Sequence, residues 1–329
     1  MEKNMKTNFD FLKERVIDSL DNTDLDYIRN QLSQLDEPTI FSGVGGSSVV
    51  SEFGAKVINV KNGIVSVNSE PRDFLYRNNS AFRNVVACSY SGNNYGVELS
   101  FLNELKKYLL SNNAFEDKDV TYLKYDTTID SERSFISLGA TLIPVSILMD
   151  YYLNGKDKAL VDSIQEQDFD FEPENDIYEI YTGHDTSTAS KYLESTITES
   201  GIGIPLVHDK YSFCHGRSTT SINHNNIAIY LNRGTELDKL LLDELYKYYK
   251  TVIRPVEIKE FIYNNYLGFF VVCLILFCLV IALATFLALL WKYYKKDELI
   301  LRKYKIDPSN EDDEELKKYD QKISCFILY

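Results

Sequence analysis

Two turns in the first half of the chain combine glycine with short polar side chains directly after apolar stretches. The first is Gly43-Val44-Gly45-Gly46-Ser47-Ser48, and the second is Ser89-Tyr90-Ser91-Gly92-Asn93-Asn94. A helix-compatible stretch follows each turn, so free amides, a positive helix end and hydroxyl donors would converge there, as a phosphate dianion requires. Each turn alone is better explained as a glycine turn with a serine cap, and it is their pairing that favours a phosphate site.

Other ligand-binding patterns are missing from the sequence. Neither turn ends in the GK[ST] of a Walker A motif, and GVGGSS departs from GxGxxG at its last position, which disfavours a dinucleotide site. The four histidines and five cysteines show no HxxxH or CxxC spacing, so we expect no metal and no other cofactor. A net charge of −14 disfavours binding to a nucleic-acid backbone.

Taken together and in this order, the two turns resemble the sugar isomerase (SIS) domain family. Its marks are a GxGxS-like first turn and an SxSGxT loop after a later strand; Asn94 stands here in place of the threonine. The resemblance covers about residues 38–258 and implies flavodoxin-like parallel sheets, phosphosugar binding and frequent dimerisation. We predict that the phosphate is bound by Ser47, Ser48, Ser89, Ser91, Gly92, Asn93 and Asn94. We predict sugar contacts for Gly45, Gly46 and His184, with a loop-capping role for His184 as the alternative.

The second half resembles the isomerase domain of glucosamine-6-phosphate synthase at Tyr192–Glu199 and at Phe213-Cys214-His215-Gly216. In that family a glutamate moves a proton between sugar carbons and a histidine assists ring opening, so the resemblance implies these catalytic roles for Glu199 and His215. Thr196 replaces the family's lysine and Arg217 its proline, which puts transamination in doubt and leaves aldose–ketose isomerisation open.

The residue types agree with these roles. A glutamate can act as general base in an enediol proton transfer when partial burial raises its pKa toward neutrality. A histidine is a natural acid–base partner for the ring oxygen. The alternative is a solvent-facing Glu199 at a helix end and a turn histidine bonded to backbone.

The order of elements predicts an α/β fold of two SIS halves with parallel sheets flanked by helices. Within the first half we expect one or two strands at 57–67 and a helix reaching about Leu110. The similar order in both halves suggests an internal duplication. The expected segments are a helical preamble (1–37), a first half (38–155), a linker (156–175), a second half (176–260), a hydrophobic helix (261–292) and a charged tail (293–329).

Residues 267–291 form a run of 25 residues without a charge. As a helix this run would be about 37 Å long, enough to cross a bilayer, and aromatic residues flank both ends. A core helix packed on the sheet is the alternative. The basic residues after the run predict that the tail lies in the cytoplasm. The free cysteines and the missing signal sequence indicate instead that the folded halves lie in the cytoplasm. One span cannot place both ends on the same side. We predict a membrane span that attaches a cytoplasmic SIS domain to the inner face, with its orientation open.

Two functions from different classes remain. The first is a sugar-phosphate isomerase that uses Glu199 and His215. The second is a phosphosugar sensor without catalysis, tethered to the membrane. In the resembling synthase the histidine serves the neighbouring subunit's site, so we expect a homodimer in which each site is shared.

Overall fold

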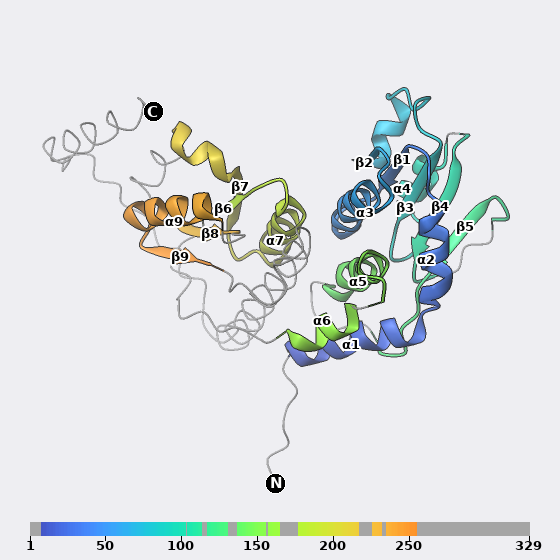
Figure 1. The fold of residues 1–329 in the computed structure, drawn as a ribbon, viewed down its shortest axis with the longest axis horizontal. Coiled ribbons are helices and arrows are strands. Elements are labelled where there is room, and N and C mark those ends of the chain that lie inside the picture. The colour runs from blue at the N-terminus through green and yellow to red at the C-terminus, as the bar shows by residue number, and fades with distance from the viewer. Residues whose placement is uncertain are drawn as a thin grey trace, which may run out of the picture.

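Two parallel sheets, one in each half of the chain, organise the protein. The computed structural model describes residues 8–102, 104–113, 117–130, 137–155, 157–164, 177–216, 226–231 and 235–254. We call residues 8–164 of this set the first lobe and residues 177–254 the second lobe; Figure 1 shows both.

The first lobe holds a five-stranded sheet of order β2-β1-β3-β4-β5, and every neighbouring pair is parallel. Its strands are β1 (Thr39–Ser42), β2 (Ser66–Ser69), β3 (Asn84–Cys88), β4 (Lys106–Ser111) and β5 (Val120–Lys124). β1 and β3 are buried along their whole length, as central parallel strands covered on both faces must be.

The second lobe repeats this order with a four-stranded parallel sheet, β7-β6-β8-β9. Its strands are β6 (Ile177–Thr182), β7 (Ile204–Asp209), β8 (Ile227–Tyr230) and β9 (Thr251–Ile253). In both sheets the first strand lies between the second and the third, which is the flavodoxin-like arrangement. The predicted parallel sheets flanked by helices are therefore confirmed, and the shared order agrees with a duplication.

Helices cover the faces of both sheets. Those of the first lobe are α1 (Asn8–Asn22), α2 (Leu25–Ser33), α3 (Gly46–Asn62), α4 (Tyr95–Ser100), α5 (Gly139–Leu153), α6 (Asp157–Ser163) and the short η1 (Pro71–Leu75). Those of the second lobe are α7 (Ser187–Ser200), α9 (Glu236–Tyr248) and the short η2 (Lys210–His215). The preamble is thus two helices, α1 and α2, and both pack against α5. Helix α6 lies at the start of the predicted linker.

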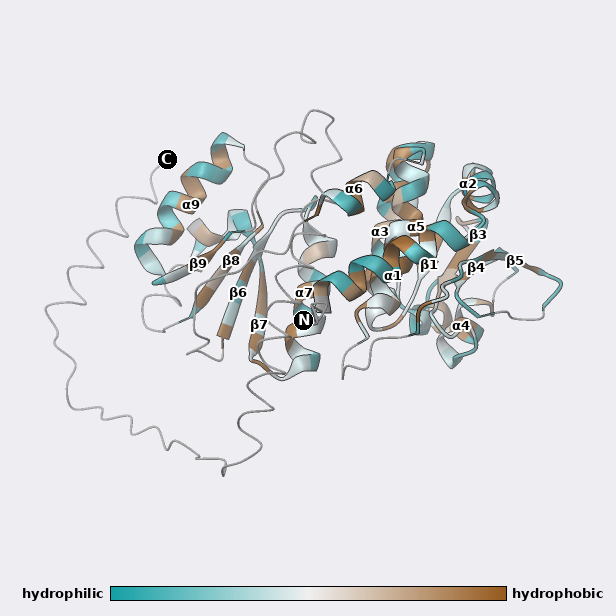
Figure 2. Cartoon of the chain, turned by 90° about the horizontal axis from the view of Figure 1, so that it is seen from below, coloured by the Kyte–Doolittle hydropathy of each residue, from teal (hydrophilic) through white to brown (hydrophobic). Residues whose placement is uncertain are grey.

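One hydrophobic cluster joins the two lobes. It contains Phe53 of α3 and Leu148 of α5 together with Leu193 and Ile197 of α7, all buried. Figure 2 shows hydrophobic residues concentrated in the strands of both sheets. Because α3 and α7 pack against each other, the first turn of one lobe and the long helix of the other belong to one packed unit.

Two sequence expectations in the first lobe were wrong. Residues 57–62 form the last turns of α3 rather than a strand, since this helix continues to Asn62 and packs on α5. The helix expected up to about Leu110 ends at Ser100, and the apolar residues beyond it form β4, which lies between β3 and β5. Pairing with two neighbouring strands decides the conformation of such a short apolar run.

The predicted hydrophobic helix (261–292) and charged tail (293–329) lie outside the described residues. Among the helices of the described ranges, none has the length and apolar character needed to cross a bilayer.

Candidate functional site

The two glycine turns predicted to bind phosphate lie side by side at the carboxyl edge of the first sheet. They leave β1 and β3, which are paired in register with Ser42 opposite Ala87. The first turn packs against α4, which follows the second turn: a Cβ added at Gly96 would lie 3.2 Å from Val44 Cγ2, and Ser100 Oγ donates to Ser42 Oγ of β1 at 2.9 Å. The chain runs in opposite directions along the sheet after β1 and β3, and ligands of such sheets bind in the crevice at this switch point.

The first turn is held by its glycines and by Ser48. Gly45 has a φ of 58°, a left-handed conformation that favours glycine, and α3 begins at the next residue. A Cβ at Gly46 would lie 2.3 Å from Thr141 Oγ1, so α5 passes close behind the turn. Ser48 is buried and its Oγ donates to the Gly45 carbonyl at 2.7 Å, whereas Ser47 is partly exposed. Of the two hydroxyls, Ser47 is the one that can reach a ligand.

The second turn is preformed by hydrogen bonds of its own. Ser89 is buried, and its Oγ accepts hydrogen bonds from Gly92 N at 3.1 Å and from Asn94 Nδ2 at 2.9 Å. Asn94 Oδ1 accepts from Val97 N and so caps α4. Both polar groups of Asn94 are therefore engaged within the turn. Ser91 is partly exposed and Asn93 is exposed, and these two are the better placed ligand contacts.

A buried arginine supports the second turn from behind, and the sequence offered no signal for it. Arg15 of α1 is 1% exposed, and its Nη2 donates to the Tyr90 hydroxyl at 3.0 Å. Its Nε donates to the Ile129 carbonyl at 3.3 Å. Ser111 Oγ of β4 also donates to the Tyr90 carbonyl at 3.2 Å. Arg15 thus holds the side chain of Tyr90, and Ser111 holds its backbone, directly before Ser91.

The packing of α7 on α3 directs Glu199 toward the first turn. The two helices are antiparallel. Lys56 contacts Ser187 and Thr188 at the start of α7. Glu52 lies one turn earlier on α3, and it contacts Thr188 and faces Lys191, which lies one turn later on α7. Glu52 contacts α7 from Ser187 at 2.6 Å to Lys191 at 3.9 Å, so at 1.5 Å per residue Glu199 lies about 12–18 Å further along α7, and Gly46 lies about 9 Å back along α3. Glu199 is exposed and accepts a hydrogen bond from Ser195 Oγ at 2.8 Å.

His215 lies at the opposite edge of the second sheet from Glu199. Glu199 precedes β7, and His215 ends η2, which follows it. The six residues of β7 separate the two side chains by about 20 Å within one chain. His215 is exposed, and β7 is an edge strand with exposed apolar side chains at Ile204 (57%), Leu206 (37%) and Val207 (38%).

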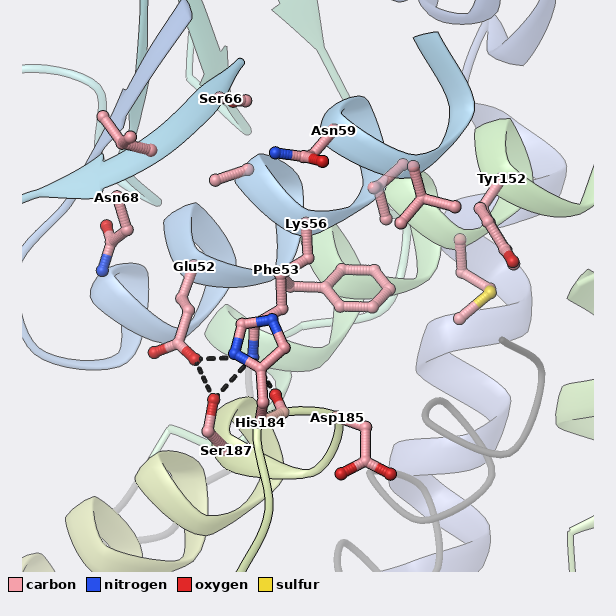
Figure 3. A pocket seen from close by; sticks show the side chains of 15 residues that line it. Glu52, Phe53, Lys56, Asn59, Ser66, Asn68, Tyr152, His184, Asp185 and Ser187 are labelled. Atoms are coloured by element: carbon pink, nitrogen blue, oxygen red, sulfur yellow. Dashed lines mark hydrogen bonds and ion pairs between the residues drawn. The ribbon is translucent and has the colours of Figure 1, made fainter. Parts of the chain in front are cut away.

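His184 does not join the glycine turns. It lines a cavity of about 460 Å³ over the carboxyl-terminal half of α3, together with α3, β2 and α5 residues such as Val60, Asn68 and Tyr152 (Figure 3). Glu52, Phe53 and Lys56 in the middle of α3 also line this cavity, about 9–15 Å along the helix from Gly46. The predicted site residues therefore lie in separate places: the glycine turns, Glu199 near the end of α7, His215 beyond β7, and His184 in this cavity. In the described part of the chain, no cluster of metal-ligating side chains is present.

Solved structures with this architecture show which fold the chain shares. No protein-family model matches the chain, and no curated protein matches its sequence. Its structural neighbours are phosphosugar isomerases and other SIS-domain proteins, which confirms the resemblance at the level of the fold.

Three of these neighbours show how far the likeness extends. Tagatose-6-phosphate ketose/aldose isomerase from Escherichia coli superposes with a TM-score of 0.66 at 15% identity, over 85% of this chain and 92% of that one. The C-terminal domain of glucosamine-fructose-6-phosphate aminotransferase from Francisella tularensis gives 0.62 at 11% identity, over 87% and 98%. Glucosamine-6-phosphate deaminase from Thermotoga maritima gives 0.59 at 11% identity, over 84% and 94%. Identities this low establish the shared fold and leave activity to be argued from the site.

Proposed function

We propose that the protein binds a phosphorylated sugar at the β1/β3 crevice and isomerises it between aldose and ketose forms. The observation that carries this proposal is the position of the two glycine turns at the ends of adjacent strands, at the switch point of the sheet. The Ser47 and Ser91 hydroxyls supply neutral donors for a dianion at the positive amino end of α3. The sugar would then extend from the phosphate toward the end of α7.

Glu199 is the proposed base. It would take the proton from the carbon beside the carbonyl, leaving an enediolate, and return it to the former carbonyl carbon. The proton of the adjacent hydroxyl passes to the former carbonyl oxygen, so that this hydroxyl becomes the new carbonyl. This isomerisation moves only protons and therefore needs no cofactor. The position of Glu199, directed along α7 toward the first turn, supports this role.

His215 would act across a homodimer interface. The distance along β7 argues against a site that takes both residues from one chain. The exposed apolar residues of β7, an edge strand, fit contact with a second copy, since such edges are normally protected or paired. A twofold dimer would then place His215 of each chain in the other chain's site.

The test is proton exchange during turnover. The protein is incubated with fructose 6-phosphate in heavy water, and deuterium incorporation at the sugar carbons is followed by NMR. Glu199→Gln and His215→Ala should each abolish exchange while retaining sugar-phosphate binding. Mixing the two variants under subunit-exchange conditions should recover up to about a quarter of parental activity by random assortment. A confirmed mixed dimer without activity, beside an active parent, would refute the shared site.

Two side chains favour a phosphosugar sensor without catalysis as the second candidate. Thr196, in the lysine position of the resembling family, is 3% exposed and its Oγ1 donates to the Tyr192 carbonyl of its own helix at 2.9 Å. Asn94, in the threonine position, is used as a helix cap. A parent that binds fructose 6-phosphate but exchanges no deuterium would decide for the sensor.

Attachment to the inner face of a membrane is a further part of the proposal, and it rests on the uncharged run 267–291 of the sequence. A chain ending near Glu260 should be soluble without detergent and retain sugar-phosphate binding. Unfolding of this shorter chain, with a full-length protein that needs no detergent, would identify the run as a core helix instead.

A further inference from the structure

The amino end of α7 has no side-chain cap from its own lobe. Its N-cap residue, Thr186, makes no side-chain hydrogen bond to the helix amides. The Thr186 hydroxyl instead contacts Thr182 Oγ1 at 2.7 Å and accepts from Gly183 N at 2.9 Å. The first turn of α7 also lacks an acidic residue, which would normally complement the positive helix end.

Glu52 of α3 supplies the missing carboxylate from the first lobe. Its Oε1 accepts a hydrogen bond from Ser187 Oγ at 2.6 Å (Figure 3). It accepts a second from Thr188 Oγ1 at 3.2 Å, and these are the first two residues of α7. Lys56 Nζ donates to the same oxygen at 2.9 Å, and Lys191 Nζ lies 3.9 Å from Oε2. We call these five residues the α3–α7 latch.

The latch is charged and largely withdrawn from water. Glu52 is 19% exposed and Lys56 is 20% exposed. Burial would raise the pKa of Glu52, but the charge of Lys56, the hydrogen bonds of Ser187 and Lys56 and the charge of Lys191 together lower it, so the carboxylate stays ionised at neutral pH. Lys56 Nζ also donates to the His184 carbonyl at 2.9 Å, so the pair holds both the loop before α7 and its first turn.

We infer that Glu52 is a positioning residue, which locks the register of α7 on α3 and thereby sets the distance between Glu199 and the glycine turns. The inference rests on the proposed function, because it assigns Glu199 to the sugar bound at those turns. Residues 52 and 187 are 135 positions apart and belong to different lobes, so this contact joins two elements that the chain itself does not hold together. Helix α3 begins at the first turn and α7 ends one residue after Glu199, so a shift of α7 at the latch moves Glu199 relative to turns that stay with the first lobe.

The experiment compares Glu52→Gln and Glu52→Ala with Glu194→Gln, an exposed glutamate on α7 that serves as the matched control. Turnover of fructose 6-phosphate and the dissociation constant of inorganic phosphate are measured for each protein. A misplacement of about 1 Å can reduce turnover about 100-fold, so we expect kcat to fall about 10- to 100-fold in both Glu52 variants. The dissociation constant of phosphate should change less than about twofold, since the phosphate turns lie within the first lobe. Glu52→Asp, which keeps the charge, should recover part of the lost kcat.

Hydrogen exchange of the α7 amides supplies a readout that does not depend on activity. Exchange in the first turn of α7 should be faster in Glu52→Gln than in the parent and in Glu194→Gln. Unchanged exchange, or unchanged kcat in an active protein, overturns the inference. Equal losses of kcat and phosphate affinity also overturn it, because they would show a general loss of structure. A parent that binds no sugar phosphate refutes the proposed function instead. The role of Glu52 in positioning Glu199 is then refuted as well. The exchange result still decides whether the latch exists.

Discussion

Replacing Ser89 and Ser91 one at a time separates the two tasks of the second glycine turn. Ser89 Oγ is an internal acceptor for Gly92 N and Asn94 Nδ2, whereas Ser91 is the partly exposed hydroxyl that can reach a phosphate. Ser89→Ala should therefore act through the loop, and Ser91→Ala through the ligand.

The magnitudes follow from what each change leaves unpaired. In Ser89→Ala the buried Gly92 N–H loses its acceptor, at a cost of about 1–3 kcal/mol, while the exposed Asn94 amide can turn to water. The melting temperature should fall by a few degrees, since 1 kcal/mol corresponds to about 2–4 °C in domains of 150–250 residues. In Ser91→Ala stability should change by less than about 0.5 kcal/mol, as for most surface substitutions. The loss of one charge-assisted hydrogen bond should weaken sugar-phosphate binding about 10- to 100-fold.

The assay is calorimetric titration with fructose 6-phosphate and with inorganic phosphate, beside thermal melts of each variant. Ser80→Ala, an exposed serine in the loop before β3, is the control for the substitution itself. A Ser91→Ala protein that binds both ligands as the parent does would refute the assignment of the crevice. A Ser89→Ala protein that melts at the parental temperature would refute the internal role of Ser89.

Three further predictions concern buried groups. Burial alone would raise the pKa of Glu179, but hydrogen bonds from His208, Tyr249, Asn226 and Tyr181 lower it to about 2. Glu179 therefore stabilises the protein above about pH 4.3, the usual glutamate pKa, and this stabilisation is lost as the pH falls toward 2. Between these pH values the free energy of unfolding of Glu179→Gln should depend less on pH than that of the parent. For Asp157, burial and its hydrogen bond to Asp150 raise the pKa to about 7. Stability should then fall as the pH rises from about 4 to 7 and level off above, and Asp157→Asn should remove this slope in urea titrations. Gly46→Ala should destabilise the protein by about 1–3 kcal/mol, because its Cβ would meet Thr141 Oγ1. Thr141→Ala in the same chain should restore much of the loss, and additive effects of the two changes would contradict the contact.

The glycine turns and the division into two halves could be predicted from the sequence because their signals are local. Gly45 and Gly92 both adopt positive φ, and each turn follows a fully buried strand. Turn chemistry of this kind depends on residues within a few positions of one another. The same locality made residues 57–62 and β4 hard to assign, because short apolar runs fit a helix or a strand equally well until their neighbours are known.

Which residues meet was decided only by the tertiary structure. Strand order places the two turns side by side although their starts are 46 positions apart, and no periodicity in the sequence encodes that order. The antiparallel packing of α7 on α3 directs Glu199 toward the first turn and leaves His184 in a separate cavity. Arg15 behind Tyr90 and Glu52 at the start of α7 join segments 75 and 135 residues apart. Such contacts exist only once burial of the shared core has brought the segments together, so the sequence determined the local chemistry of the site and the packing determined its assembly.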